Sequence, residues 1–227
     1  MERQPDAYLL PGRFVDSHNP AVIGFARDAA RGASGQTEAA IRLYYRVRDA
    51  IRYDPYGIHL DPDAFRASRC LARGTGFCIT KAALLAASAR AVGIPARLGY
   101  ADVKNHLATP KLLELLGTDL FTFHGYTDLQ LDGTWVKATP AFNLSLCQKF
   151  RVLPLEFDGR TDSVFHPFDA DGRRHMEYVL DRGTRADVPF DEIAESFRAV
   201  YPRMHGPGGS SYAGDFEAEA ATEAGKA

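Results

Sequence analysis

The chain has 227 residues, of which 45% are hydrophobic and 25% charged, and this composition is that of an ordinary globular protein. Its formal net charge is only −2 and its basic residues are scattered, so we expect no nucleic-acid partner. No apolar run approaches the roughly 18 residues of a membrane span, and the first residues do not resemble a signal peptide. The three cysteines form no CxxC pair, which favours a reducing compartment, and we expect a cytoplasmic location.

The first half of the chain predicts helices. Asn19 and Pro20 open a short helix that runs to residue 31, and an apolar stripe at helical spacing predicts a stronger one over 37–52. A short helix is expected over 63–72. Residues 77–92 are rich in Ala and Leu and predict a helix that Gly93 caps and Pro95 prevents from continuing.

Strands follow the helices. Residues 96–103 alternate as a strand, and 120–131 and 134–139 predict a hairpin around Asp132-Gly133. We expect a short helical insertion near the cleft between 103 and 120, short strands over 153–188 and a last helix over 189–201. Helices first and strands afterwards indicate an α+β fold with an antiparallel sheet.

The chain predicts one domain over 1–205, followed by a tail over 206–227. The tail is rich in Gly, Ser, Ala and Glu and nearly lacks large aliphatic residues. This composition predicts a disordered segment.

Cys78 is the candidate nucleophile. It follows the Gly74-Thr75-Gly76 turn at the start of the helix over 77–92, near the unpaired N–H groups and the positive end of the helix dipole. Both features predict a lowered thiol pKa, and the same N–H groups can form an oxyanion hole. The alternative for a free cysteine is a small buried core residue, which is our interpretation of Cys70 and Cys147.

His124 is the candidate base, on the first strand of the predicted hairpin. A two-residue turn at Asp132-Gly133 places His124 opposite Ala141, with Thr139 on the diagonal and Asn143 on the same face. Thr139 or Asn143 is therefore expected to orient the imidazole. No HExxH motif, paired Cys/His spacing or EF-hand loop is present, so we expect no metal and no cofactor.

Three motifs resemble the transglutaminase-like superfamily. GTGFCITKAALLAASARAVGIPAR, from Gly74, is similar to its cysteine signature, and EAAIRLYYRVRDAIRYD resembles its V-R-D-x-I-x-Y helix. HGYTDLQLDGTWVKATP, from His124, resembles its H-x-W-x-E…G-x-W…D-P hairpin. The resemblance covers a core of about 37–143 and leaves 144–205 as a C-terminal elaboration.

This resemblance implies the papain-like fold of a bacterial-type transglutaminase core domain, with N-terminal helices and a Cys-bearing helix packed on an antiparallel sheet. It implies a Cys-His-Asp triad that performs acyl transfer or hydrolysis on an amide or peptide bond through a thioester. Cys78 matches the nucleophile and His124 the base. The expected partners are a peptide, protein or small amide substrate and an amine acceptor, with no nucleic acid and no membrane.

The chain departs from the family pattern at one position, where Thr139-Pro140 replaces Asp-Pro. A threonine can accept a hydrogen bond from imidazole but offers no charge to imidazolium, whereas Asn fills this role in papain-like enzymes. Two hypotheses follow. The protein is a cysteine-dependent acyltransferase or an amidase or peptidase, or it is a non-catalytic binding module on the same scaffold.

Overall fold

The structure is a computed structural model that describes residues 7–106, 108–165, 168–169, 171–204 and 214–224. Its α-helices are α1 (Pro20–Ala29), α2 (Gln36–Ala50), α3 (Ala67–Arg73), α4 (Cys78–Ala91), α5 (Pro110–Leu116), α6 (Leu144–Phe150), α7 (Phe190–Val200) and α8 (Phe216–Ala224). Its strands are β1 (Arg52–Tyr53), β2 (Thr75–Gly76), β3 (Ala96–Asn105), β4 (Leu120–Leu131), β5 (Thr134–Ala138) and β6 (Met176–Arg185). Two short 3-10 helices are η1 (Pro62–Phe65) and η2 (Pro202–Met204).

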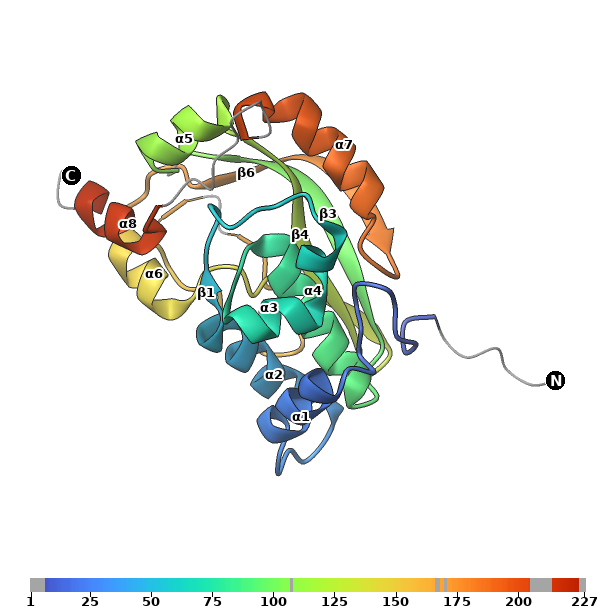
Figure 1. Cartoon of the computed structure of the whole chain (residues 1–227). Coiled ribbons are helices and arrows are strands. Elements are labelled where there is room, and N and C mark those ends of the chain that lie inside the picture. The colour runs from blue at the N-terminus through green and yellow to red at the C-terminus, as the bar shows by residue number, and fades with distance from the viewer. Residues whose placement is uncertain (1–6, 107, 166–167, 170, 205–213, 225–227) are drawn as a thin grey trace.

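A four-stranded antiparallel sheet in the order β5-β4-β3-β6 forms one layer of the fold. The N-terminal helices α1, α2 and α3 and the Cys-bearing helix α4 lie together beside it (Figure 1). The short strands β1 and β2 pair in parallel and tie the end of α2 to the turn before α4. The expected α+β fold, with a Cys-bearing helix on an antiparallel sheet, is confirmed.

Helix α4 is buried on all sides. It packs on β3 and β4 and is covered by α1, α2 and α3, and every residue from 79 to 90 is buried. A helix that is apolar all round belongs inside a protein, and its small residues let the neighbouring elements approach closely. No helix in the described part of the chain is long and apolar enough to cross a bilayer.

Two cationic side chains inside this core satisfy backbone carbonyls. Lys81 Nζ donates to the carbonyls of Arg48 (2.9 Å) and Ile51 (2.5 Å), at the end of α2. Arg90 donates to the carbonyls of Ala96 and Leu10, both at 2.7 Å. A buried charge is tolerated only with such partners, so both side chains hold α4 to its surroundings.

The predicted hairpin is confirmed in its register. Leu131 pairs with Thr134 across a turn in which Asp132 and Gly133 have φ values of 49° and 84°. Both are left-handed, as a two-residue hairpin turn requires.

Two segments differ from the predictions. The helix expected over 63–72 is divided into η1 and α3, because Arg66 is extended (ψ 141°). The short strands expected over 153–188 are replaced by the long edge strand β6, which pairs with β3. Most of β6 is exposed, Tyr178, Val179 and Leu180 included, so it lacks the alternating burial by which sequence patterns reveal strands.

The prediction of a disordered tail is wrong for residues 216–224, which form α8; residues 206–213 and 225–227 lie outside the described residues. Helix α8 packs against α6, as Figure 1 shows. Phe216 is buried among the rings of Tyr53, Tyr56 and Phe150, with centroid distances of 5.8, 6.1 and 5.3 Å. The burial of this one aromatic side chain holds the helix to the protein, although the segment has no other large apolar residue.

Glu217 and Glu219 bind α8 to two other helices. Partial burial opposes ionisation of Glu217, but hydrogen bonds from Lys149, Asn143 and Ser145 hold its pKa at about 2. Glu219 accepts hydrogen bonds from a second group, at the start of α5 and in the loop after β1: Lys111, Thr109 and Tyr56. The segment therefore fastens α5 and α6 together. The limits of the single domain stay a prediction.

The anchoring of α8 predicts that Phe216→Ala lowers the free energy of unfolding by about 3 kcal/mol, because it leaves a cavity among aromatic rings. Urea unfolding of the full chain measures this. Phe168→Ala is the matched control, since Phe168 is half exposed, and it should change stability by less than about 0.5 kcal/mol. Equal effects of the two substitutions would contradict the packing of α8.

Candidate active site

Cys78 is the first residue of α4, as predicted. Phe77 precedes it in an extended conformation (φ −115°, ψ −178°). The Thr80 hydroxyl accepts a hydrogen bond from Phe77 N–H (3.1 Å) and donates one to the Phe77 carbonyl (3.2 Å). These bonds set the first helical residue, so the thiol lies where the free N–H groups of the helix begin.

Gly125 brings the start of α4 against β4. A Cβ atom at Gly125 would lie 3.0 Å from Ile79 Cα and 3.4 Å from Ile79 N, with both atoms in the first turn of α4. Glycine alone permits this approach without displacing the helix. The Gly125 amide favours the thiolate form of Cys78, and His124, the residue before Gly125, lines the same pocket as Cys78. The two predicted site residues are therefore brought together.

A β-bulge lies immediately before His124. The pairing of β3 with β4 shifts by one residue, so that Asp102 stands against both Thr122 and Phe123. Phe123 has a positive φ of 54°, and its N–H donates to the Asp102 carboxylate at 3.0 Å. Bulges of this kind redirect neighbouring side chains, and this one sets the direction of His124.

Arg182 completes the support of the bulge from β6. Its Nε and Nη2 atoms donate to the two Asp102 oxygens at 2.6 and 2.8 Å, and Asp102 is buried. This planar pair holds the carboxylate that the Phe123 amide needs. The sequence interpretation missed both residues. The one available signal was an acidic residue inside the otherwise apolar strand LGYADV.

The two residues expected to orient His124, Thr139 and Asn143, differ in their hydrogen bonds. Thr139 is buried directly after β5, and its hydroxyl has no hydrogen-bond partner among the described residues; the same holds for Nε2 of His124. Asn143 is engaged elsewhere: its Oδ1 accepts the N–H of Tyr53 (3.0 Å), and its Nδ2 donates to Ser145 and Glu217. These contacts join β1, α6 and α8, so they favour a structural role for Asn143 over orientation of His124.

Burial controls the ionisation of both candidate residues. It raises the pKa of the Cys78 thiol to about 11, although the amides of Gly125, Ile79 and Cys78 itself favour the thiolate. It lowers the pKa of His124 to about 4. The predicted lowering of the cysteine pKa is therefore wrong for the free protein, because desolvation of the charge outweighs the helix N–H groups. At neutral pH the resting pair is a thiol and a neutral imidazole.

The pocket shared by Cys78 and His124 is small and apolar. It measures about 40 Å³. Its other lining residues come from β1 and the loop after it, the residue before α4, α5, β4, α7 and the residue after α7: Tyr53, Pro55, Ile58, Phe77, Leu112, Leu116, Phe121, Thr122, Phe197 and Tyr201. The predicted helical insertion near the cleft is confirmed, since α5 supplies Leu112 and Leu116.

The segment after the predicted core covers the histidine. The Phe165 ring lies 4.9 Å from the His124 ring, centroid to centroid, and also packs on Phe142 (5.1 Å) and His175 (5.7 Å). This aromatic cover removes water from the imidazole, which is the physical cause of its low pKa.

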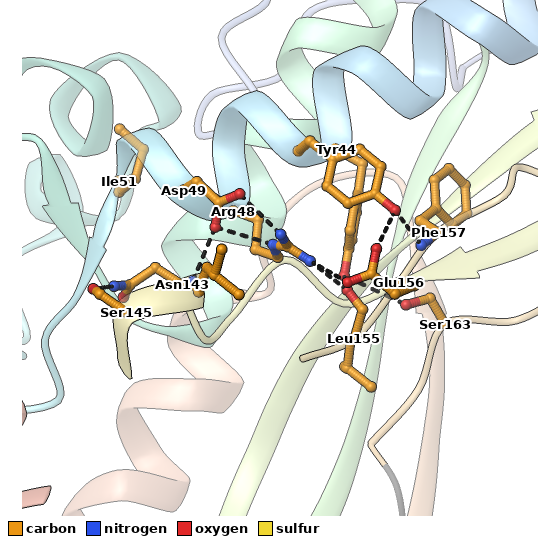
Figure 2. Close-up of polar contacts among 12 residues, drawn as sticks. Tyr44, Arg48, Asp49, Ile51, Asn143, Ser145, Leu155, Glu156, Phe157 and Ser163 are labelled. Carbon is orange, nitrogen blue, oxygen red and sulfur yellow. Dashed lines mark hydrogen bonds and ion pairs between the residues drawn. The ribbon is translucent and has the colours of Figure 1, made fainter. Parts of the chain in front are cut away.

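The V-R-D motif, residues 47–49 at the end of α2, forms hydrogen bonds with the chain that follows β5. Figure 2 shows the guanidinium of Arg48 paired with Asp49 and donating to the Leu155 carbonyl at 2.8 Å. Asp49 accepts the N–H of Leu144, and the Tyr44 hydroxyl contacts the carbonyls of Thr139 (3.2 Å) and Leu155 (2.9 Å). The motif therefore positions the chain around Thr139 and provides no reacting group.

The comparisons agree with the motifs. The family model of the transglutaminase-like superfamily matches residues 23–140, which is more than half of the chain. The protein belongs to the transglutaminase-like superfamily. No curated protein matches the sequence.

Two solved structures are similar. One is from Cytophaga hutchinsonii and is provisionally named a cysteine protease; its TM-score is 0.46 at 16% identity, over 81% of this chain and 55% of that one. The other, from Parabacteroides distasonis and provisionally named a protease, has a TM-score of 0.38 at 14% identity, over 63% of this chain and 28% of that one. The present chain thus spans little more than half of the first neighbour and less than a third of the second.

The contact at Gly125 predicts that Gly125→Ala lowers the free energy of unfolding by about 1–3 kcal/mol, because the added methyl group forces α4 and β4 apart. Thermal or urea unfolding measures the change. Gly24→Ala is the control: this glycine lies in α1 with no atom within 4 Å of an added Cβ, and alanine there should stabilise by up to about 1 kcal/mol. A neutral Gly125→Ala would contradict the close approach.

The low pKa of His124 predicts a pH-dependent stability. Its ordinary pKa of 6.5 is lowered to about 4 in the folded protein, so the unfolded chain takes up a proton first as the pH falls. The contribution is present above about pH 6.5 and is lost towards pH 4, by about 2 kcal/mol between pH 7.5 and pH 5. Urea unfolding of His124→Asn should lack this part of the pH dependence. His59→Asn, at an exposed histidine, is the control, and an equal change in both variants would refute the assignment.

Proposed function

We propose that the protein is a cysteine enzyme that performs acyl transfer or hydrolysis on an amide or peptide bond, with Cys78 as nucleophile and His124 as base. One observation carries the proposal. The thiol of Cys78, at the start of a helix whose residues 79–90 are all buried, shares a small apolar pocket with the imidazole of His124. A core cysteine has no use for this arrangement.

In the proposed reaction His124 takes the thiol proton as the sulfur of Cys78 attacks the substrate carbonyl carbon. The carbonyl electron pair moves to oxygen, and N–H groups at the start of α4 are the donors available to stabilise that charge. The C–N bond then breaks, the imidazolium protonates the leaving amine, and a thioester remains. Water or an amine acceptor attacks the thioester and regenerates the thiol.

The neutral resting pair makes substrate binding the step that activates the thiol. Burial disfavours a separate thiolate and imidazolium, so proton transfer is expected to accompany attack on the carbonyl. No described carboxylate contributes to the pKa of His124. We therefore propose a dyad of Cys78 and His124; orientation of the imidazole by Thr139 stays a prediction, since the Thr139 hydroxyl and Nε2 of His124 have no hydrogen-bond partner among the described residues.

The substrate classes that fit this chemistry are a peptide, a protein or a small amide, with water or an amine as acceptor. The provisional protease names of the structural neighbours are compatible with hydrolysis. The free thiols of Cys70, Cys78 and Cys147 suit a reducing compartment, and we propose that this is the cytoplasm.

A non-catalytic binding module is the second candidate function. The observation in its favour is that Nε2 of His124 has no hydrogen-bond partner among the described residues, while Thr139 stands where the family has Asp. In that case Cys78 would be no more reactive than a core thiol.

Alkylation distinguishes the two candidates. Iodoacetamide near neutral pH should label Cys78 at least about tenfold faster than Cys70 or Cys147, because those two thiols are at most 2% exposed and Cys78 opens into the pocket. Peptide mapping by mass spectrometry measures each site. His124→Ala should slow Cys78 labelling by removing the base, while His59→Ala should not. Equal labelling of the three cysteines in the folded protein, or Cys78 labelling that His124→Ala leaves unchanged, would support the binding module.

A further inference from the structure

The size and lining of the pocket beside Cys78 limit which acyl groups of a substrate can bind next to the thiol. Its walls include Leu112 and Leu116 of α5, Phe121 of β4 and Phe197 of α7. No Asp, Glu, Lys or Arg from the described ranges lines it. The Tyr201 hydroxyl is already used, since it accepts the Thr122 N–H (2.6 Å) and donates to the Leu120 carbonyl (3.0 Å).

The wall lined by α5 is held at both ends of the helix. In the first turn, Thr109 caps Leu112 N–H, and Glu219 of α8 accepts from Thr109 and Lys111. At the other end, Arg203 Nη1 donates to the Glu114 carbonyl at 2.9 Å. A wall fastened in this way resists displacement, so the size of the pocket limits what enters.

That size is small. An apolar protein cavity that holds benzene measures roughly 150 Å³, whereas the pocket beside Cys78 measures about 40 Å³. This space holds a methyl or ethyl group, whereas a ring or a long chain would have to displace the walls or extend out of the opening. A carboxylate or ammonium group would lose its water there without gaining a partner, at a cost of several kcal/mol.

We propose that this pocket is the acyl-binding subsite and that it selects short, neutral aliphatic acyl groups, of acetyl to propionyl size, for transfer to Cys78. The inference rests on the proposed function and adds to it the substrate class. Leu112 and Leu116 set the upper limit of acyl length, and the absence of a charged group in the described lining sets the requirement for neutrality.

A series of 4-nitrophenyl esters tests the selection on the full-length protein. In each reaction the Cys78 sulfur forms a bond to the ester carbonyl carbon, the bond from that carbon to 4-nitrophenolate breaks, and the thiol proton passes to His124. Acetate, propionate, hexanoate and the charged succinate monoester are compared. Release of 4-nitrophenolate gives the rate, peptide mapping gives the site, and each rate is normalised to that of free cysteine with the same ester.

The expected result is that acetate and propionate acylate Cys78 at least about tenfold faster than hexanoate and succinate, because added methylenes or charge do not fit the pocket. Leu116→Ala should then reduce the preference for propionate over hexanoate at least about fivefold. Leu115→Ala is the matched control, since Leu115 is equally buried on α5 but does not line the pocket, and it should keep the preference.

The outcomes separate the two proposals. Equal rates for the short, long and charged esters at Cys78 would overturn the subsite while leaving Cys78 a nucleophile. An unchanged preference in a folded Leu116→Ala variant would overturn the role of α5. If neither the esters nor iodoacetamide modifies Cys78 in preference to Cys70 and Cys147, the proposed function itself fails. The ester series on the unsubstituted protein decides the selection even if a leucine variant does not fold.

Discussion

The burial of α4 on all sides is the constraint on which the other features of the structure depend. A helix without a solvent face keeps its long basic side chains away from water, so Lys81 and Arg90 reach the carbonyls of neighbouring elements and fix their positions. The same close packing requires a glycine at position 125, where β4 crosses the first turn of α4. Cys78 and His124 are neighbours because a core helix, and not a surface loop, sets the distance between their backbones.

The parts of the fold that follow from local signals could be predicted from the sequence. The Ala/Leu run with Gly93 and Pro95 beyond it indicated α4, and Asp132-Gly133 indicated a hairpin in its correct register. The cysteine signature and the histidine position identified the family that the comparison supports. Each of these signals lies within a few residues of the feature it predicts, and for that reason none required knowledge of tertiary contacts.

The remaining features depend on contacts between residues far apart in the sequence. Helix position alone predicted a lowered Cys78 pKa, but desolvation of the thiol reverses the direction. The cover that Phe165 gives to His124 likewise comes from a distant part of the chain, and burial lowers the pKa of that imidazole. Asn143 looked like an orienting residue by strand alternation, yet its amide bonds Tyr53 and Glu217. Helix α8 has one large apolar side chain, Phe216, and is held by it and by two carboxylates whose partners are distant in the sequence. The amino-acid composition and local sequence patterns do not indicate these long-range contacts.

The fastening of α5 by Glu219 has a consequence for biosynthesis. Tyr56 and Glu219 are 163 residues apart in the sequence, and Thr109 and Glu219 are 110 apart. A ribosome that makes roughly 5–20 residues per second therefore exposes β1, α4 and the hairpin for several seconds before α8 is available. The nascent chain therefore passes through a stage in which Cys78 and α5 have been made but the contacts of Glu219 with Tyr56, Thr109 and Lys111 have not formed.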